Sequence, residues 1–274
     1  MAVYPGTAQR ELSAGRHFFY VAVALSRMEF KLRYFGSVLG YLWSFLRPFL
    51  LFGVLYLVFT KIVRAGAGVP HYPVLLLFGL VLFNFLADAT MMGLPSLVAR
   101  ESLLRKVSFP RASIPIAVTA TAAANLALGL GVVLVLALVN DVAVRASWLM
   151  MFPLFLAVFA FAAALALLLS VLFVRYRDVQ PVWDVALQFV FWGTPIIYTI
   201  DFIPERYRQF VMLNPLAVAV EQGRHWLVGS EVPTATAVMG SNAKLLLPAA
   251  VFVGVIVLSV WTFRRRSASI AEEL

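Results

Sequence analysis

Two long apolar runs without charge place the strongest constraint on this chain. Residues 112–139 and 148–174 contain no Asp, Glu, Lys or Arg, and a short turn at 140–147 joins them. A helix of about 20 apolar residues crosses the roughly 30 Å of bilayer hydrocarbon and satisfies its own backbone hydrogen bonds there. Each run therefore predicts a transmembrane helix.

Four further apolar runs are long enough to cross a bilayer, namely residues 38–59, 73–98, 181–200 and 245–263. The whole chain is 62% apolar and 13% charged, with a mean hydropathy of +0.92, which lies far outside the usage of soluble globular proteins. The sequence therefore predicts an all-α membrane protein whose transmembrane domain, residues 38–264, contains six transmembrane helices.

The basic residues predict the orientation of these helices. Of the 22 lysines and arginines, 15 lie in segments that six spans place on one side of the membrane and seven lie on the other. By the positive-inside rule the richer side is cytoplasmic, so both termini, including the tail at 265–274, should lie inside. The formal charge of +9 then predicts contact with anionic membrane lipids rather than with nucleic acid.

Residues 1–37 read as a polar tail followed by an amphipathic helix at the membrane surface. Over 16–35, apolar residues recur every three or four positions, and basic residues occupy the other faces. The alternative, a transmembrane helix, would bury Arg27, Glu29, Lys31 and Arg33 at a cost of several kcal/mol each. We therefore expect an interfacial helix and no removable signal peptide.

The loop at 99–111 mixes basic and large apolar residues, in the run LLRKVSFPR at 103–111. If this segment forms a short helix, its mixed surface suits docking into a groove on another protein. A solvated basic loop is an equally good interpretation of the spacing alone. A second irregular segment, 201–243, has apolar pieces too short to span and is cut by Pro204, Pro215 and Pro233. It predicts re-entrant or interfacial helices on the outer side.

Aromatic residues gather in the runs at 73–98 and 181–200. Such rings are most often packing or membrane-interface residues, but sugar rings also stack on aromatic planes. The candidates for lining a channel are Phe83, Phe85, Phe189, Phe191, Trp192 and Tyr198.

Two acidic residues also lie within apolar runs, where an ionisable group is a candidate functional residue. For Asp184 a structural pair with Arg175 or Arg177 is favoured. For Asp88 a structural hydrogen bond is favoured over contact with a sugar.

Several chemistries are excluded or unsupported. The chain has no cysteine, which excludes disulfides and thiolate sites, and it has no GxxxxGK[ST] phosphate-binding loop. We predict no catalytic residue, no metal site and no cofactor on this chain. If ATP drives its function, another polypeptide must bind the nucleotide.

Several separate motifs carry a family resemblance. FKLRYFGSVLGYLWSFLRP at 30–48, LLRKVSFPR at 103–111, VRYRDV at 174–179, TPIIY and IPERY at 194–207 and LNPLAVAVEQGR at 213–224 keep their order over nearly the whole chain. Together they resemble the permease subunits of type-two ABC exporters for polysaccharides, which include O-antigen, capsular polysaccharide and teichoic acid exporters.

The resemblance implies a homodimer in the bacterial plasma membrane that exports a lipid-linked glycan through an aromatic-lined channel at the dimer axis. Two cytoplasmic ABC ATPase subunits would bind ATP and Mg. The resemblance implies a gate helix before the first span, with Arg27, Lys31, Arg33 and Tyr34, and re-entrant helices before the sixth. The implied coupling helix contains Leu103, Leu104, Arg105, Lys106, Val107, Ser108, Phe109 and Arg111.

Two other function classes make different predictions. A secondary transporter should carry inverted repeats with broken midplane helices, and a membrane glycosyltransferase should carry clustered carboxylates for metal and sugar nucleotide. The sequence has no evident repeat, and its acidic residues are scattered. An ABC permease is therefore the favoured interpretation.

Overall fold

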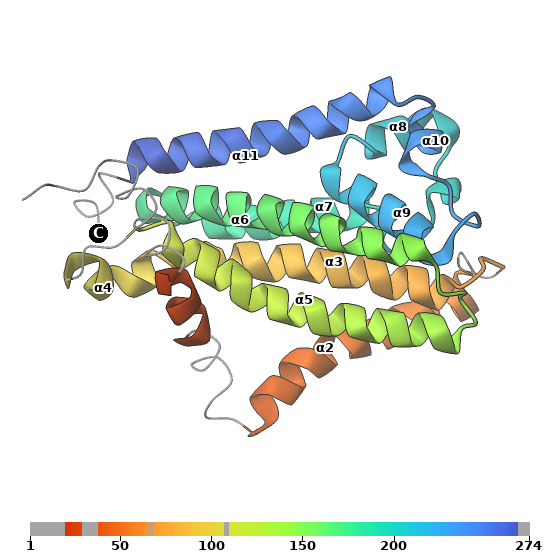
Figure 1. Ribbon diagram of the computed structural model, residues 1–274, viewed down its shortest axis with the longest axis horizontal. Helices are drawn as coiled ribbons and strands as arrows, with labels where there is room; N and C mark the ends of the chain where they lie inside the picture. Colours follow the sequence, from red (N-terminus) through yellow and green to blue (C-terminus); the bar gives the residue numbers. More distant parts are fainter. Residues whose placement is uncertain (1–19, 29–37, 65, 67, 107–109, 268–274) are drawn as a thin grey trace, which may run out of the picture.

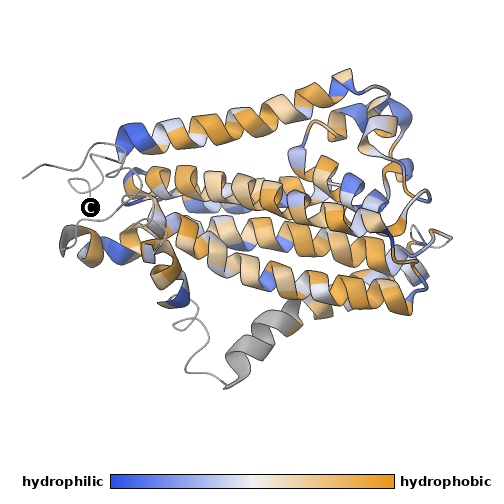
Figure 2. Ribbon diagram, in the orientation of Figure 1, coloured by the Kyte–Doolittle hydropathy of each residue, from blue (hydrophilic) through white to orange (hydrophobic). Residues whose placement is uncertain are grey.

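The computed structural model describes residues 20–28, 38–64, 66, 68–106 and 110–267, with the backbone alone at 38–45, 47–48 and 105–106. Within these residues the regular elements are all helices, which confirms the predicted all-α class. The long helices are apolar along most of their length, and the hydrophilic residues gather at their ends and in the connections (Figure 2). This distribution suits a bundle that lies in a bilayer.

The centre of the bundle is α3 (Tyr72–Gly93), which packs against α5 (Ser113–Val139) and α6 (Met151–Arg175) (Figure 1). Small residues allow the close approach. A Cβ added at Gly129 of α5 would lie 2.9 Å from Cγ1 of Val81, and one at Gly93 of α3 would lie 2.6 Å from Cβ of Ala166. Such contacts hold membrane helices together by dispersion forces, since lipid offers no hydrophobic drive.

Two long helices lie at the edges of this bundle. Helix α11 (Leu246–Arg266) runs along α6, and α2 (Val38–Leu57) leads into a π-helical turn at Val58–Ile62. The N-terminal end of α2 lies away from the bundle, while its C-terminal half approaches α3 (Figure 1). Both helices therefore expose much apolar surface, including Leu50, Val54, Val257 and Leu258.

Among the residues that the structure describes, four helices are long and apolar enough to cross a membrane: Tyr72–Gly93, Ser113–Val139, Ala146–Arg175 and Ala243–Arg266. They correspond to the second, third, fourth and sixth predicted spans. Helix α7 (Val179–Gly193) has only 15 residues, about 22 Å of helix, and ends at Gly193 rather than at the expected Ile200. The first and fifth spans, and hence the number six, stay predictions.

The connections gather at the two ends of the bundle. The helix at residues 20–28, α4 (Glu101–Lys106), the start of α7 and the end of α11 lie at one end (Figure 1). The other end carries the 140–145 turn and the helices α8 (Glu205–Val211), α9 (Pro215–Val228) and α10 (Ala235–Met239). Segments that the sequence assigns to the same side of the membrane thus lie together.

The segment 201–243 consists of short helices, as its prolines predict. Pro215 occupies the first turn of α9, where its missing N–H costs nothing, and Asn214 Oδ1 accepts a hydrogen bond from Leu216 N at 3.0 Å. Thr234 Oγ1 caps α10 in the same way, accepting from Ala237 N at 3.1 Å. Each helix therefore starts where a proline and a capping side chain interrupt the preceding backbone.

Candidate functional site

An irregular, buried segment follows α7 at residues 194–199. Thr194 and Ile196 are fully buried. Within the segment, Ile196 N donates a hydrogen bond to Thr194 O at 2.7 Å. Buried backbone carbonyls need hydrogen-bond donors, and a segment without helix or sheet cannot supply them itself. The donors must therefore come from side chains elsewhere in the fold.

Arg224 of α9 supplies most of these donors. Its Nη1 donates to Pro195 O at 2.5 Å and Tyr198 O at 3.4 Å, and its Nη2 donates to Ile196 O at 2.6 Å. Its Nε donates to Leu75 O of α3 at 3.1 Å. This guanidinium, which is only 2% exposed, therefore ties α9, α3 and the 194–199 segment together.

Two further side chains complete this arrangement, which we call the Arg224 clasp. Glu221, one turn earlier on α9 and 1% exposed, accepts a hydrogen bond from Arg224 Nη1 at 2.9 Å. Tyr72 Oη donates to Ile197 O at 2.5 Å. Gly79 leaves room, because a Cβ there would lie 3.2 Å from Arg224 Nη2. Helix α7 ends at Gly193 because Pro195 has no N–H and disfavours a helical conformation at Thr194, and the clasp then supplies donors to the carbonyls that follow.

Beside the clasp, four of the predicted channel aromatics come together. The ring centroids of Phe83 on α3 and Phe191 on α7 are 4.9 Å apart, and those of Phe191 and Trp192 are 5.3 Å apart at nearly right angles. Tyr198 Oη donates to Trp192 O at 2.8 Å. Trp192 is 61% exposed, so this aromatic cluster of Phe83, Phe191, Trp192 and Tyr198 reaches the surface of the single chain.

The other two predicted channel aromatics lie elsewhere. Phe189 is 75% exposed on α7. Phe85 is 2% exposed and packs against Phe159 of α6, with ring centroids 6.4 Å apart, so within one chain it is a core residue. Which rings line a channel stays a prediction.

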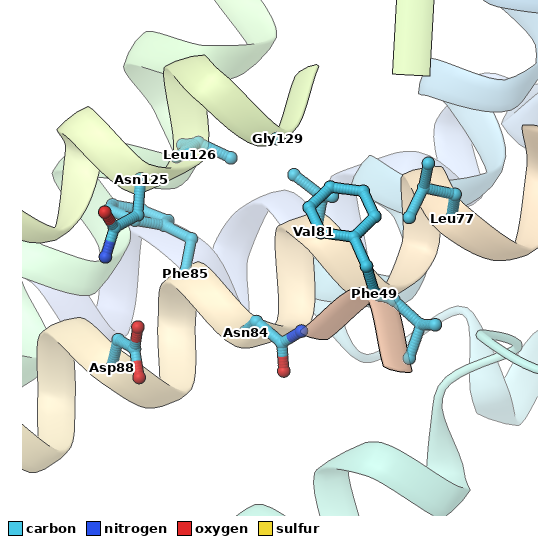
Figure 3. A pocket seen from close by; sticks show the side chains of 10 residues that line it. Phe49, Leu77, Val81, Asn84, Phe85, Asp88, Asn125, Leu126 and Gly129 are labelled. Carbon is cyan, nitrogen blue, oxygen red and sulfur yellow. The ribbon is translucent and has the colours of Figure 1, made fainter. Parts of the chain in front are cut away.

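Polar side chains line a narrow cavity of about 50 Å³ between α2, α3 and α5 (Figure 3). Asn84 and Asp88 lie one turn apart on α3, and Asn125 projects from α5, while Phe49 of α2 lies over the same space (Figure 3). Polar groups at membrane depth are candidates for contact with a polar ligand. Asp88 thus lies among amides that can bind hydroxyl groups, and its two predicted roles stay open.

The expected pairing of Asp184 is absent from the described residues. Asp184 is exposed on α7. Arg175 instead lies over the ring of Tyr176, with Cζ 5.4 Å from the centroid, and Arg177 lies over the ring of Phe173 at 4.7 Å. Both arginines therefore make cation–π contacts in place of the predicted ion pair.

The predicted coupling segment is described in part. Leu103 and Leu104 of α4 are half-buried and pack on an apolar cluster that includes Leu97 of the turn after α3 and Ile114 of α5. Arg105 and Lys106 form the end of α4, Arg111 lies in the turn before α5, and Val107, Ser108 and Phe109 lie outside the described residues. Burial lowers the pKa of Arg100, just before α4, from its ordinary value.

The predicted gate helix is described at residues 20–28, where Arg27 is exposed. Lys31, Arg33 and Tyr34 lie outside the described residues. Ser26 Oγ donates to Ala117 O of α5 at 3.2 Å, and Leu25 is buried in the same apolar cluster as Leu103 and Leu104. The gate and coupling segments, which the sequence presents as separate motifs, thus share one packed cluster.

Comparison with known proteins identifies the family. The sequence pattern of the family described as ABC-2 type transporter matches residues 20–227, from the helix at 20–28 to α9. The chain belongs to this family. Two relatives from Klebsiella pneumoniae, each named O-antigen export system permease protein RfbA, are 29% and 28% identical over 202 residues, or 73% of this chain and 77% of each relative.

A protein of the same name from Myxococcus xanthus is 29% identical over 200 residues, which cover 71% of this chain and 75% of the relative. These matches support the resemblance to polysaccharide-exporter permeases, whose family consists of membrane transport subunits. Within the described residues no group of three or more His, Asp or Glu side chains is placed to hold a metal ion.

Sequence reasoning missed the residues of the clasp. It counted Arg224 among the charges of the outer side, but this side chain is buried and belongs to no surface. The available signal was the spacing of Glu221 and Arg224, which places both on one face of a helix within an apolar segment. Tyr72 and Asn125 had no distinguishing pattern in the sequence.

Proposed function

We propose that this chain is the membrane subunit of an ATP-driven exporter that moves a lipid-linked polysaccharide from the cytoplasm across the bacterial plasma membrane. The observation that carries the proposal is the agreement of family and relatives: the ABC-2 match covers three quarters of the chain, and the relatives named above are O-antigen export permeases. An O-antigen, a capsular polysaccharide or a teichoic-acid-like polymer would fit the same surface.

The exposed face of α7 supports a path for sugar rather than contact with lipid. Asp184 and Gln188 are exposed there, and polar side chains of this kind are unfavourable against hydrocarbon. Helix α7 also exposes the rings of Phe189 and Trp192. Polar groups alternating with aromatic planes offer a hydroxyl-rich chain both hydrogen bonds and weak stacking contacts, which allow it to slide.

A path of this kind needs a second copy of the chain. One copy leaves α7 and much of α2 open, so two copies related by a two-fold axis would enclose the path between these faces and keep it away from lipid. We propose six spans in each copy, both termini in the cytoplasm, and re-entrant helices in 201–243 on the outer side. The end of the bundle that carries α4 and the basic end of α11 would then meet the anionic inner leaflet.

Energy would come from two ATPase subunits, which bind ATP and Mg, because the sequence has no phosphate-binding loop of its own. They would dock on the coupling segment at 99–111. Movement of α4 would reach the gate segment through their shared cluster, in which Leu25 is buried and against which Leu103 packs. The gate segment would thereby admit the lipid-linked head group.

Depletion of the protein tests this proposal. The lipid-linked glycan should accumulate in the cytoplasmic leaflet, where mass spectrometry of extracted lipids identifies it. If no such glycan accumulates while the cells still assemble their envelope polymers, the proposed substrate class is wrong.

A matched pair of variants tests the path. Phe189→Ala should slow export about two- to tenfold, since one aromatic contact is worth about 0.5–1.5 kcal/mol. Phe152 is equally exposed, at 77% against 75%, but belongs to α6 and not to the proposed path, so Phe152→Ala is the control. Equal rates for the two variants would contradict a path along α7.

A further inference from the structure

The end of α11 forms one wall of a cavity of about 460 Å³ that lies beside the coupling segment. Arg264 of α11 and Arg111 of the turn before α5 both line it. The rest of its lining is mainly apolar and comes from three elements, with Val260 and Phe263 from α11 and Leu167 from α6. The hydrophilic end of α11 (Figure 2) therefore lines the same cavity as these apolar side chains.

A second hollow lies on the other side of the same helix end. It shares Val260 and Arg264 with the first and adds Val257, Trp261 and Arg265. Arg265 lies over the ring of Trp261, with Cζ 5.2 Å from the centroid, so its stem follows the apolar surface while its charge stays at the end of the helix. Arg264 thus lines both hollows, and because the other residues that line them are mainly apolar we call them the two apolar troughs.

This arrangement matches the chemistry of a phospholipid. Two guanidinium groups from separate segments can both donate to one phosphate, and Arg binds phosphate oxygens in charge-assisted pairs. Basic pockets between transmembrane helices on the cytoplasmic side bind acidic lipid head groups. Two apolar troughs that meet at the basic site provide surfaces for two acyl chains.

We propose that an anionic phospholipid binds at this site, with its phosphate between Arg111 and Arg264 and its acyl chains along α11. The bound lipid joins the end of the coupling segment to the last helix, two parts of the chain that are far apart in sequence. The inference goes beyond the proposed function, because it depends on neither the glycan nor the direction of transport. The inner leaflet is the source of the lipid in the proposed orientation.

The test is native mass spectrometry of the purified full-length chain during titration with phosphatidylglycerol. Arg111→Gln and Arg264→Gln should each weaken the first binding step about fivefold, the effect of one basic residue near an anionic surface. Arg175→Gln is the matched control. This substitution removes the same charge from the same end of the bundle, but Arg175 lines neither hollow. Its affinity should stay within about twofold of the unchanged chain.

Two further arms separate the phosphate from the acyl chains. Val260 lines both hollows, so the larger side chain of Val260→Trp should fill part of each. This variant should weaken phosphatidylglycerol binding while both arginines stay in place. Soluble glycerol 3-phosphate, which lacks acyl chains, should not displace the lipid at equal concentration. The proposal is overturned if Arg264→Gln and Arg175→Gln have the same effect, if phosphatidylcholine binds as tightly as phosphatidylglycerol, or if glycerol 3-phosphate competes equally.

Discussion

Replacing Arg224 by Met removes the donors of the clasp while keeping an unbranched apolar stem. Glu221, which is 1% exposed, then loses its ion-pair partner, and the carbonyls of Leu75, Pro195 and Ile196 lose their side-chain donors. Breaking a buried ion pair by removing one partner costs about 3–5 kcal/mol, and each buried group left unsatisfied costs about 1–3 kcal/mol. We therefore expect a free energy of unfolding lower by at least about 3 kcal/mol.

The assay is thermal unfolding of the purified chain in detergent. A loss of this size should lower the unfolding midpoint by on the order of 10 °C. Arg208→Met is the matched control: Arg208 also pairs with a carboxylate, Asp201 at 3.5 Å, and donates to Ile203 O, but the side chains are 25% and 64% exposed. Because water screens this pair, its loss should cost at most about 1 kcal/mol.

Two further variants connect the loss of stability to the clasp itself. The double variant Glu221→Met with Arg224→Met removes the stranded carboxylate, so it should be more stable than Arg224→Met alone, although the carbonyls of 195 and 196 still lack donors. A cysteine at the buried Thr194 should become accessible to thiol reagents only when Arg224 is replaced. The reasoning is refuted if Arg224→Met is as mild as Arg208→Met, or if the double variant is less stable than the single one.

The remaining predictions concern topology, coupling and assembly. Ser267→Cys, in this chain without cysteine, should resist an impermeant thiol reagent in intact cells, and labelling there would contradict a cytoplasmic C-terminus. Val107→Asp should abolish ATP-dependent export while the protein is still made, because a charge would replace an apolar anchor; unchanged export and unchanged co-purification of the ATPase would refute the coupling assignment. Cysteines at exposed Phe189 in two copies should form a cross-link that blocks export, and failure of all α7 pairs to cross-link would contradict a shared axis.

The charge-free runs allowed the most accurate predictions of the fold. The runs 112–139 and 148–174 differ by only a few residues from the helices Ser113–Val139 and Met151–Arg175. In a bilayer, length and hydropathy determine where such a helix can exist, and both are local properties of the sequence. Proline positions predicted the short helices of 201–243 for a similar local reason.

The predicted run 181–200 extends beyond the end of α7, and one local and one distant feature account for the difference. The sequence TPIIY at 194–198 is apolar enough to lie in a membrane, but its Pro195 ends the helix locally. Its carbonyls instead accept hydrogen bonds from Arg224, which lies more than 25 residues later in the chain, and from Tyr72. Neither donor falls within the local window, so periodicity and hydropathy could not predict this unwound segment.

Residue roles were harder to predict than elements because burial and neighbours define them. Arg224 read as a surface charge and Asp184 as half of an ion pair. The structure buries the first and leaves the second exposed on α7. Phe83 and Phe85 illustrate the same limit: they lie two residues apart, yet one packs on α7 and the other on α6. Their surroundings differ only because different helices pack against the two rings.

The apolar cluster shared by the helix at 20–28 and α4 gives the proposed mechanism a mechanical basis. Leu97 and Ile114 are fully buried in this cluster, Leu25 of the helix at 20–28 is buried in it, and Leu103 of α4 packs against it. Close-packed interiors have low compressibility, so we expect a displacement of α4 to shift the helix at 20–28 or to open the cluster. The hydrogen bond from Ser26 to Ala117 ties that helix to α5, so the smallest movement that keeps the cluster closed is a rotation of the gate segment about this attachment.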